Sequence, residues 1–403
     1  MSSIAPRAAA LLVMSALAVN ALADEVGEPL NWYRCNTHTH TSAPPKSDAN
    51  ASPEYVAEWY RSHGYQCLVI TDHEFLTDVS ALNEKYAKQG DFLVIPGQEI
   101  TQALIDESRA TGKRHFHING IGTGRAIMPL GYPAGARDIA PVDMYVRNIA
   151  EIHAAGGIAQ INHPNLQWSV QLKDLLPLNQ PYLLEVWNAF PTSNNLGGID
   201  DTGSIAPSSE ALWDGLLSAG KVVWAVAADD THEYFRFDDR LSPTPGQAWV
   251  VLQAPRLTQS AVIAALRQGR FYASTGVTLQ SYVADERGIS MTLVQTPEWS
   301  PSTSKPNTRN VTRFIGEHGR VLAEVTGLNP AYRFKGDETY VRAQIVDSNG
   351  RHAWTQPYYR DGRLNQLFSQ RNAPNESDSA ALRGTTVKSP VQLPARANGP
   401  GLP

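Results

Sequence analysis

The sequence is poor in cysteine, with two in 403 residues. Two thiols can build neither a disulfide-rich scaffold nor a cysteine-based zinc site. Positive charge is not in excess either, since 34 Lys and Arg against 39 Asp and Glu leave a net charge of −5. This balance argues against a general binder of nucleic acid or anionic membranes. Hydrophobic residues are plentiful at 42%, so the chain can build the core of two packed units with tails.

The first 23 residues have the pattern of a secretory signal peptide. One positive charge, Arg7, precedes an apolar run at residues 8–19, and small residues at 21–23 form a cleavage signal. The run is short for a membrane span, and no later run is long enough. We therefore expect a periplasmic or secreted protein with no stable membrane span after cleavage. An uncleaved N-terminal anchor is the alternative.

Export would permit a disulfide between the two cysteines. Cys35 and Cys67 each lie in a segment that we expect to be a strand. Cysteine is also among the residue types most often buried as a free thiol. The sequence therefore leaves a bridge and two buried thiols open.

Strands and helices alternate from Trp32 to about Thr275. The expected strands are short and apolar, as at Gln66–Thr71, and the helices are longer, as at Ser208–Ala219. This alternation predicts an α/β fold with a parallel sheet and helical crossovers, either a barrel or an open sheet. The later chain has strands separated by turns, which predicts a small antiparallel β unit at residues 276–366. Residues 367–403 are rich in Ser, Pro, Ala, Asn and Gly, and we expect a flexible tail there.

Histidines and acidic residues stand at or just after the ends of several expected strands, where α/β folds place their sites. In a His-x-His pair on an extended backbone both imidazoles lie on one side, so they can bind one metal ion. A carboxylate has two oxygens and can bridge two ions. Any one of these histidines alone is more simply a structural side chain, but six at strand ends favour a metal centre. The candidate ligands from this pattern are His38, His40, His73, Glu99, His117, His163, Asp230 and His232.

The order of these motifs resembles the PHP (polymerase and histidinol phosphatase) superfamily, over roughly Trp32 to Thr275. The motifs are His-x-His-Thr, Thr-Asp-His, Glu, His-x-x-Gly-x-Gly, His-Pro and Asp-x-His. The resemblance implies that residues 24–275 form a distorted (β/α)7 barrel with two or three divalent metal ions at its C-terminal end. Histidine and carboxylate ligands without thiolate suit zinc, manganese or iron better than calcium or magnesium.

The resemblance also assigns the ligands to ions. One ion would be bound by His38, His40 and Asp230. A second would be bound by His73 and His232, with Asp48 as an extra ligand. A third would be bound by His117 and His163, with Glu99 bridging it to the first. The loop before Asp48 is lengthened by residues 42–46, so a surface aspartate is the alternative interpretation there.

Two further features resemble exported members of the superfamily, in the branch that includes carbamate-hydrolysing metallohydrolases. They are the runs Leu184–Asn188 and Gly269–Ser274, together with the C-terminal β unit. Amidohydrolase barrels also begin with His-x-His, but they usually continue with a bridging lysine and end with a lone aspartate. Glu99 and the Asp230-x-His232 pair fit that family less well.

Clustered cations lower the pKa of a shared water and neutralise charge on the attacked group. We therefore predict a phosphoesterase that hydrolyses a small anionic phosphomonoester or phosphodiester. One alternative is a carbamate, ester or amide hydrolase with the same metals. Another is a non-catalytic periplasmic module that binds metal or ligand. We expect no nucleic-acid partner and see no sign of an obligate protein partner.

Three residues are candidates for the chemistry around the metals. His115 could donate a proton to the leaving group. Arg125 and Arg270 could hold a substrate anion, although each is more simply a surface or structural arginine. Asp72 is expected to support a ligand rather than bind metal itself.

Overall fold

The chain is described here from a computed structural model, which covers residues 29–107, 111–237, 242–297 and 307–364. The expected signal peptide and the expected tail from residue 367 lie outside the described residues. Within the described ranges, no helix combines the length and the apolar character needed to cross a membrane.

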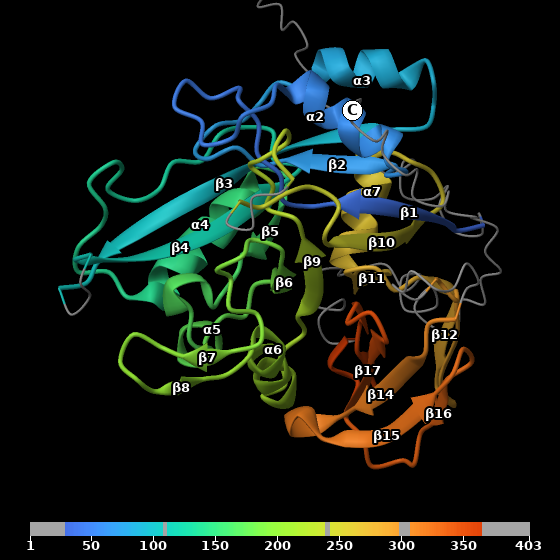
Figure 1. The fold of residues 1–403 in the computed structure, drawn as a ribbon. Helices are drawn as coiled ribbons and strands as arrows, with labels where there is room; N and C mark the ends of the chain where they lie inside the picture. Colours follow the sequence, from blue (N-terminus) through green and yellow to red (C-terminus); the bar gives the residue numbers. More distant parts are fainter. Residues whose placement is uncertain (1–28, 108–110, 238–241, 298–306, 365–403) are drawn as a thin grey trace, which may run out of the picture.

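Up to residue 274, strands and helices largely alternate (Figure 1). The strands are β1 (Asn31–Asn36), β2 (Cys67–Ile70), β3 (Leu93–Ile105), β4 (Lys113–Ile121), β5 (Ile158–Ile161), β6 (Leu183–Asn188), β7 (Gly198–Ile199), β8 (Ile205–Ala206), β9 (Trp224–Ala228), β10 (Trp249–Ala254) and β11 (Phe271–Ser274). The helices are α2 (Pro53–Ser62), α3 (Ser80–Ala87), α4 (Pro141–Ala154), α5 (Leu172–Leu175), α6 (Ser209–Ser218) and α7 (Gln259–Arg267), with a short 3-10 turn, η1 (Leu166–Trp168).

The later residues form strands, as expected. These are β12 (Leu279–Asp285), β13 (Gly288–Leu293), β14 (Asn310–Ile315), β15 (Val321–Thr326), β16 (Ala331–Arg333), β17 (Tyr340–Asp347), β18 (His352–Thr355) and β19 (Tyr358–Tyr359), with the 3-10 turn η2 (Glu317–Gly319). Strands β12 and β13 form an antiparallel hairpin.

Three helices begin at hydroxyl-bearing residues. The side chains of Ser52, Ser208 and Thr258 accept a hydrogen bond from a backbone N–H of the first turn of α2, α6 and α7. Such caps satisfy donors that a helix start otherwise leaves unpaired. In α2, Pro53 occupies the first turn, where its missing N–H costs nothing.

The closed (β/α)7 barrel was not found. The main sheet has fourteen strands in the order β15-β14-β17-β18-β11-β10-β1-β2-β3-β4-β5-β6-β9, with β19 on β17. Only β1–β2, β2–β3, β5–β6 and β6–β9 are parallel pairs. The reason is that β3 runs on for 13 residues and returns through a hairpin into β4, where a barrel would need a helical crossover. The chain therefore has a mixed α/β fold with a large sheet of parallel and antiparallel strands.

Among the described strands, none pairs with the outer side of β9, the last strand of that order. The side chain of Gln356 takes that place, since its Nε2 donates to Ala225 O at 2.7 Å and its Oε1 accepts from Ala225 N at 2.8 Å. This is the pair of bonds that a neighbouring strand would supply. The C-terminal residues thus cover the exposed edge of the first part of the sheet.

The C-terminal strands also continue the main sheet directly. Tyr272 and Ser274 of β11 pair with β18, so the β unit expected at residues 276–366 shares a sheet with the preceding strands. A buried ion pair fastens the same unit to α6, because Arg342 bonds Asp214 at 2.7–2.8 Å and contacts Glu210 at 2.7 Å. Only β12, β13 and β16 form a separate three-stranded sheet.

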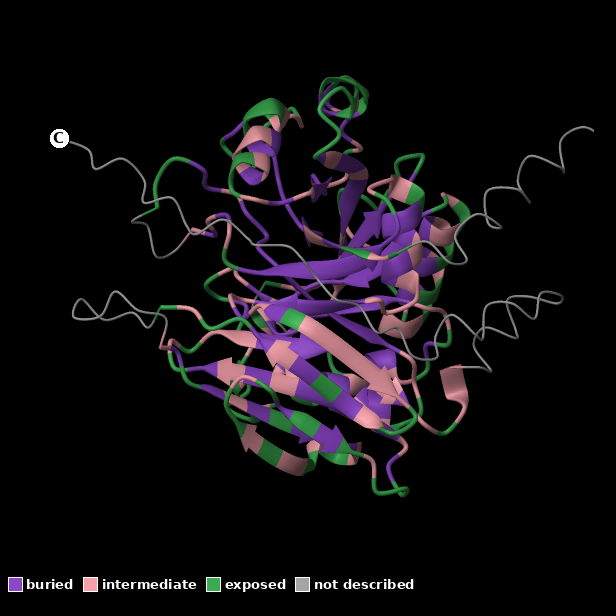
Figure 2. Ribbon diagram, turned by 90° about the vertical axis from the view of Figure 1, so that its right-hand side faces the viewer, coloured by how far each residue is buried: buried purple, intermediate pink, exposed green. Residues whose placement is uncertain are grey.

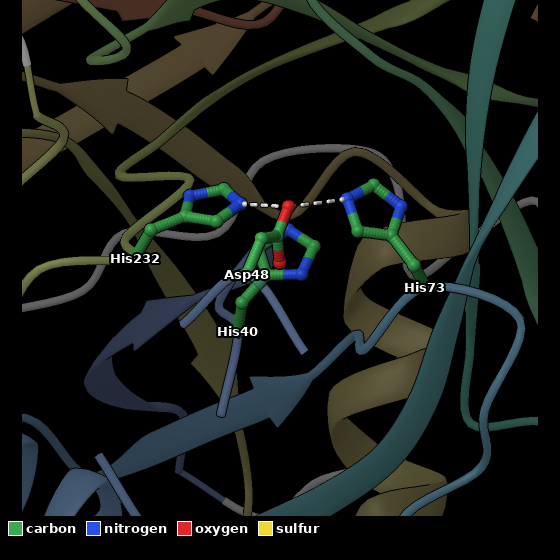
Figure 3. Close-up of side chains that lie close together, drawn as sticks. All are labelled: His40, Asp48, His73 and His232. Carbon is green, nitrogen blue, oxygen red and sulfur yellow. Dashed lines mark ion pairs between the residues drawn. The ribbon is translucent and has the colours of Figure 1, made fainter. Parts of the chain in front are cut away.

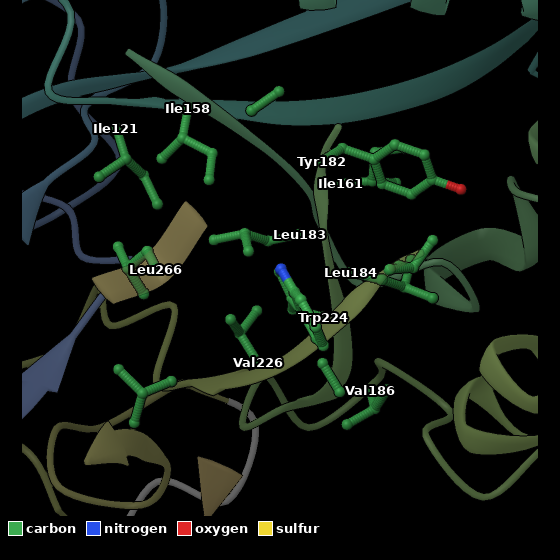
Figure 4. Close-up of a cluster of buried hydrophobic side chains, with 14 of the residues drawn as sticks. Ile121, Ile158, Ile161, Tyr182, Leu183, Leu184, Val186, Trp224, Val226 and Leu266 are labelled. Atoms are coloured by element: carbon green, nitrogen blue, oxygen red, sulfur yellow. The ribbon is translucent and has the colours of Figure 1, made fainter. Parts of the chain in front are cut away.

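The hydrophobic core is built around the central strands of the main sheet, including the parallel strands β5, β6 and β9. Figure 2 shows buried central strands, whereas the outer C-terminal strands alternate between buried and exposed residues. In β5 and β9 every residue is buried, as is typical of strands covered on both faces. Figure 4 shows the side chains that fill this region, among them Ile158, Ile161, Leu183, Leu184, Trp224 and Val226. Each such side chain contributes roughly 1.5–3 kcal/mol of burial free energy, and together they make a rigid base for the strand ends.

Of the two states left open for the cysteines, the structure has the disulfide. Cys35 of β1 and Cys67 of β2 are directly paired in the parallel ladder, with Cα atoms 4.5 Å apart. The bond joins the two strands that lead into the first histidine motifs.

Candidate metal centre

The strands that carry the histidine motifs continue to pair beyond their last regular residues. Thr39 and Thr231 form a parallel bridge, with His40 N donating to Thr231 O and Asp230 N donating to His38 O. These bonds join the ends of β1 and β9, which are not neighbours in the sheet. Asp230 adopts a left-handed backbone conformation at φ 53°, which an aspartate rarely keeps unless its surroundings impose it.

The neighbouring strand ends are tied in the same way. Thr71 N donates to Thr39 O, and His73 forms a parallel bridge with Glu99. On the next strand, His117 accepts from Asn162 N through its carbonyl. Segments far apart in the chain thus place their side chains at one end of the sheet.

The first group of side chains is His38, His40, Glu99 and Asp230, all buried. The Nε2 atoms of His38 and His40 lie 3.1 Å from Asp230 Oδ1 and 3.2–3.3 Å from Glu99 Oε2. In a tetrahedral site with bonds of about 2.0–2.1 Å, ligand atoms lie about 3.3–3.4 Å apart. The spacing of these four residues therefore fits a single ion such as zinc.

The second group is His40, Asp48, His73 and His232 (Figure 3). Asp48 Oδ2 lies 3.4 Å from His73 Nε2 and 3.3 Å from His232 Nε2. Although burial opposes ionisation, the close contacts with His232 and His73 hold the pKa of Asp48 well below its usual range. The lengthened loop thus brings Asp48 to the two histidines that the resemblance assigned to it.

The third group surrounds the other oxygen of Glu99. His117 Nδ1 lies 2.9 Å and His163 Nε2 lies 3.4 Å from Glu99 Oε1, while His73 Nδ1 lies 3.3 Å from Oε2. Burial lowers the pKa of His117 to about 4, so this imidazole is neutral and available as a ligand at pH 7. Because the two oxygens of Glu99 face different imidazoles, this residue can bridge two ions. Burial of Glu99 opposes its charge, but the attraction of His38 and the hydrogen bond from His117 hold its pKa well below the usual range.

Glu185 of β6 contacts two candidate ligands, and sequence reasoning did not assign it this place. Its Oε1 lies 2.8 Å from His38 Nδ1, and its Oε2 accepts from His163 N at 2.6 Å. A carboxylate only accepts, so Nδ1 of His38 carries the proton and Nε2 presents its lone pair to the first group. The run containing Glu185 stood out in the sequence, and its polar side chain in an apolar strand was the available signal.

Two other buried carboxylates hold the segments that carry ligands. Asp72 accepts from the backbone N–H and the hydroxyl of Thr41 at 2.6 and 2.8 Å, which matches its expected supporting position. Asp229 accepts from three consecutive backbone N–H groups at residues 246–248, from Asn36 Nδ2 and from Tyr60 Oη. Burial raises the pKa of Asp229 to about 6. The Asn36–Asp229 bond is a second link between the ends of β1 and β9.

His115 lies on β4 two residues before His117, and therefore on the same face of the strand. It is not part of the three groups above. Burial lowers its pKa, with a smaller contribution from the charge of Lys113. His115 is therefore near the candidate centre and not a member of it.

The structure does not bring the two arginines to the centre. Arg125 pairs with Glu151 at 2.6 Å with half of its side chain exposed, and it follows β4. Because β4 runs antiparallel to β3, the residues after it lie at the opposite end of the sheet. The carbonyl of Arg270 accepts a hydrogen bond from Gln253 N, and Gln253 pairs with Trp32. Trp32 lies at the start of β1, whereas His38 follows the end of that strand. The motif spacing gave no information on strand direction, so the placement of these arginines could not be seen in the sequence.

Comparison with known proteins gives weak likenesses only. No family model and no curated protein matches the chain. A two-domain protein from Bacteroides vulgatus containing a predicted PHP-like metal-dependent phosphoesterase is 13% identical, with a TM-score of 0.39 over 82% of this chain and 95% of that one. A candidate metal-dependent phosphoesterase from Bifidobacterium adolescentis is 15% identical, with a TM-score of 0.32 over 52% and 89%. At such TM-scores the likenesses carry no argument, and the function has to be argued from the residues of this chain.

Proposed function

We propose that the chain is an exported metal-dependent hydrolase, and that it is a phosphoesterase acting on a small phosphomonoester or phosphodiester. The observation that carries the proposal is the position of Glu99 between the candidate ligands. It is buried, and its two oxygens face two sets of imidazoles at 2.9–3.4 Å. A buried carboxylate shared in this way is costly without cations, and adjacent cations suit a reaction on an anionic group.

The residues that would hold two or three divalent ions are His38, His40, Asp48, His73, Glu99, His117, His163, Asp230 and His232. Zinc, manganese or iron suits this donor set. Bound there, such ions would lower the pKa of a shared water and neutralise charge on the attacked phosphate.

The protein's own groups orient the ligands and move protons. Glu185 fixes the tautomer of His38, and the carbonyl of Asp230 does the same for His232, whose Nδ1 donates to it at 2.8 Å. His115 is proposed as the proton donor to the leaving group, since its strand face is that of His117. This arrangement needs no serine or cysteine nucleophile.

Cleavage of a carbamate, ester or amide is the second candidate. The positions of Arg125 and Arg270 favour it, because a dianionic phosphate usually gains from a basic side chain that these two do not supply. A non-catalytic binding module is less well supported, since such a module has no need to keep all nine ligand positions intact.

The test is a metal-reconstituted assay of the mature protein with an aryl phosphate, an aryl phosphodiester and an aryl carbamate. We expect phosphate release that a chelator abolishes, and more than one transition-metal ion per chain. His38→Ala and Asp230→Ala should remove turnover, while Arg125→Ala should keep it. Fast carbamate cleavage without phosphate release would reverse the order of the two candidates. Full turnover in His38→Ala would refute the metal-centre proposal.

A further inference from the structure

The ribbon of β3 and β4 carries a partly exposed strip that begins at the candidate centre. Figure 1 shows this ribbon running outward beside the rest of the sheet. Three successive cross-strand pairs on the face of His117 form the strip: Thr101 with His117, Ala103 with His115, and Ile105 with Lys113. These side chains are partly exposed, whereas Phe116 on the opposite face is buried. Thr101 Oγ1 lies 2.7 Å from His73 Nδ1, so the inner end of the strip touches the candidate centre.

Two basic side chains lie outward of His117 along this strip. His115 and Lys113 stand two and four residues before it, and side chains on a strand repeat their direction at every second residue. At about 3.3 Å per residue, the Cα atom of Lys113 lies about 13 Å from that of His117. Burial lowers the pKa of His115, and the charge of Lys113 lowers it further. The imidazole and the ammonium group are therefore neighbours on one face.

The ammonium group of Lys113 has no ion pair or hydrogen-bond partner within the described residues. The adjacent Arg114 lies on the other face, over the ring of Phe116, and pairs there with Asp174. On the same hairpin, Glu107 pairs with Arg137 at 3.4 Å. A charge at a protein surface gains more from an opposite charge than one in bulk water does, because the local dielectric constant is lower. Lys113 therefore offers an unused positive charge to a ligand that reaches past His115.

We propose that Lys113 binds a second acidic group of the substrate, a carboxylate or a phosphate, on the part that leaves. The inference rests on the proposed function, because it places the reacting bond at the metal centre and takes His115 as the proton donor to the leaving group. Since His115 stands between His117 and Lys113, a leaving group that it protonates extends towards Lys113. The preferred substrate is then an ester of an alcohol or phenol that itself carries an acid. This holds for a phosphate and for a carbamate, because Lys113 contacts only the leaving side.

The experiment compares two aryl phosphates, or the corresponding aryl carbamates, with a carboxymethyl or a carbamoylmethyl group para to the ester oxygen. The two groups are similar in size, and the methylene keeps the acidity of the two phenols similar. Wild-type holoenzyme should show about fivefold higher kcat/KM for the carboxymethyl ester, the size of a favourable ion pair exposed to solvent, and high salt should reduce this preference. Lys113→Gln should abolish the preference, and Lys113→Arg should retain it. A phosphonomethyl ester measured alongside shows whether a phosphate-like acid or a carboxylate gains more.

Lys88→Gln is the matched control, at an exposed lysine that follows α3 and precedes β3, at the end of that strand away from Ile105. This variant should keep the wild-type preference. The metal content of Lys113→Gln should equal that of wild type, since Lys113 is not among the candidate ligands. Equal kcat/KM for the acid and the amide in wild type, or an unchanged preference in Lys113→Gln, would overturn the inference and leave the hydrolase proposal standing. Absence of cleavage of any phosphate or carbamate by metal-loaded protein would instead overturn the proposed function.

Discussion

Replacing Glu185 by glutamine tests how far a neighbouring carboxylate prepares the candidate metal centre. The change keeps the shape of the side chain and removes its charge and one acceptor. Four donors reach this carboxylate in the structure, at 2.6–2.9 Å: His38 Nδ1, Gln160 Nε2, His163 N and Asn188 Nδ2. An amide has one oxygen, so its NH₂ group must face two of these donors.

The magnitude follows from that count. Each buried donor left without an acceptor costs about 1–3 kcal/mol, so the free energy of unfolding should fall by about 2–6 kcal/mol. Loss of a carboxylate that orients a histidine ligand typically weakens metal binding about 10–100-fold, or roughly 1.4–2.7 kcal/mol. Both effects should appear, because Glu185 supports the fold around His163 and the tautomer of His38.

The assay is titration of the metal-free protein with zinc or manganese, together with urea unfolding. Glu151→Gln is the matched control, since Glu151 pairs only with the half-exposed Arg125 at the other end of the sheet. Glu151→Gln should change neither the metal affinity nor the free energy of unfolding. Metal affinity of Glu185→Gln within about twofold of wild type would refute the orienting role.

Two further predictions concern stability. The disulfide closes a sequence separation of 32 residues, and loop entropy then predicts that Cys35→Ala with Cys67→Ala lowers the free energy of unfolding by about 3.7 kcal/mol. Urea unfolding of oxidised wild type against the double variant measures this, and equal stabilities would contradict it. Burial opposes the charge of Glu338, but the backbone N–H of Lys335 and further hydrogen bonds lower its pKa to about 2. A carboxylate with a lowered pKa stabilises the fold above its unfolded pKa, so wild type should lose up to about 3 kcal/mol relative to Glu338→Gln as pH falls from about 4.5 towards 2. Unfolding at pH 7 and pH 3 tests this, with the exposed Glu324→Gln as control, and parallel pH curves for wild type and Glu338→Gln would count against it.

The sequence predicted most of the candidate centre because its signals are local. A His-x-His pair needs only an extended backbone to place both rings together, and His38 and His40 lie 3.2 Å apart at Nε2. The start of the helix expected at Ser208–Ala219 was a local signal too, since Ser208 caps α6. What could not be predicted depends on strand direction. The return of β3 into β4 stands where we expected a helical crossover, and it carries Arg125 to the far end of the sheet.

Glu185 escaped prediction for a related reason. Its role comes from contacts with His38, 147 residues away, and with the backbone of His163. No spacing in the sequence encodes such a contact. The sequence could not decide between a disulfide and two thiols for the same reason. Cys35 and Cys67 are neighbours only because of the register of β1 on β2.

The bond pair between Gln356 and Ala225 has a consequence for shortened forms of this protein. A chain that ended before β18 would leave one flank of β9 with bare amide and carbonyl groups. Uncovered strand flanks recruit strands from other molecules, which leads to aggregation. The last described segment therefore protects the edge of β9, and the part that carries the candidate metal centre is best produced with its C-terminal strands attached.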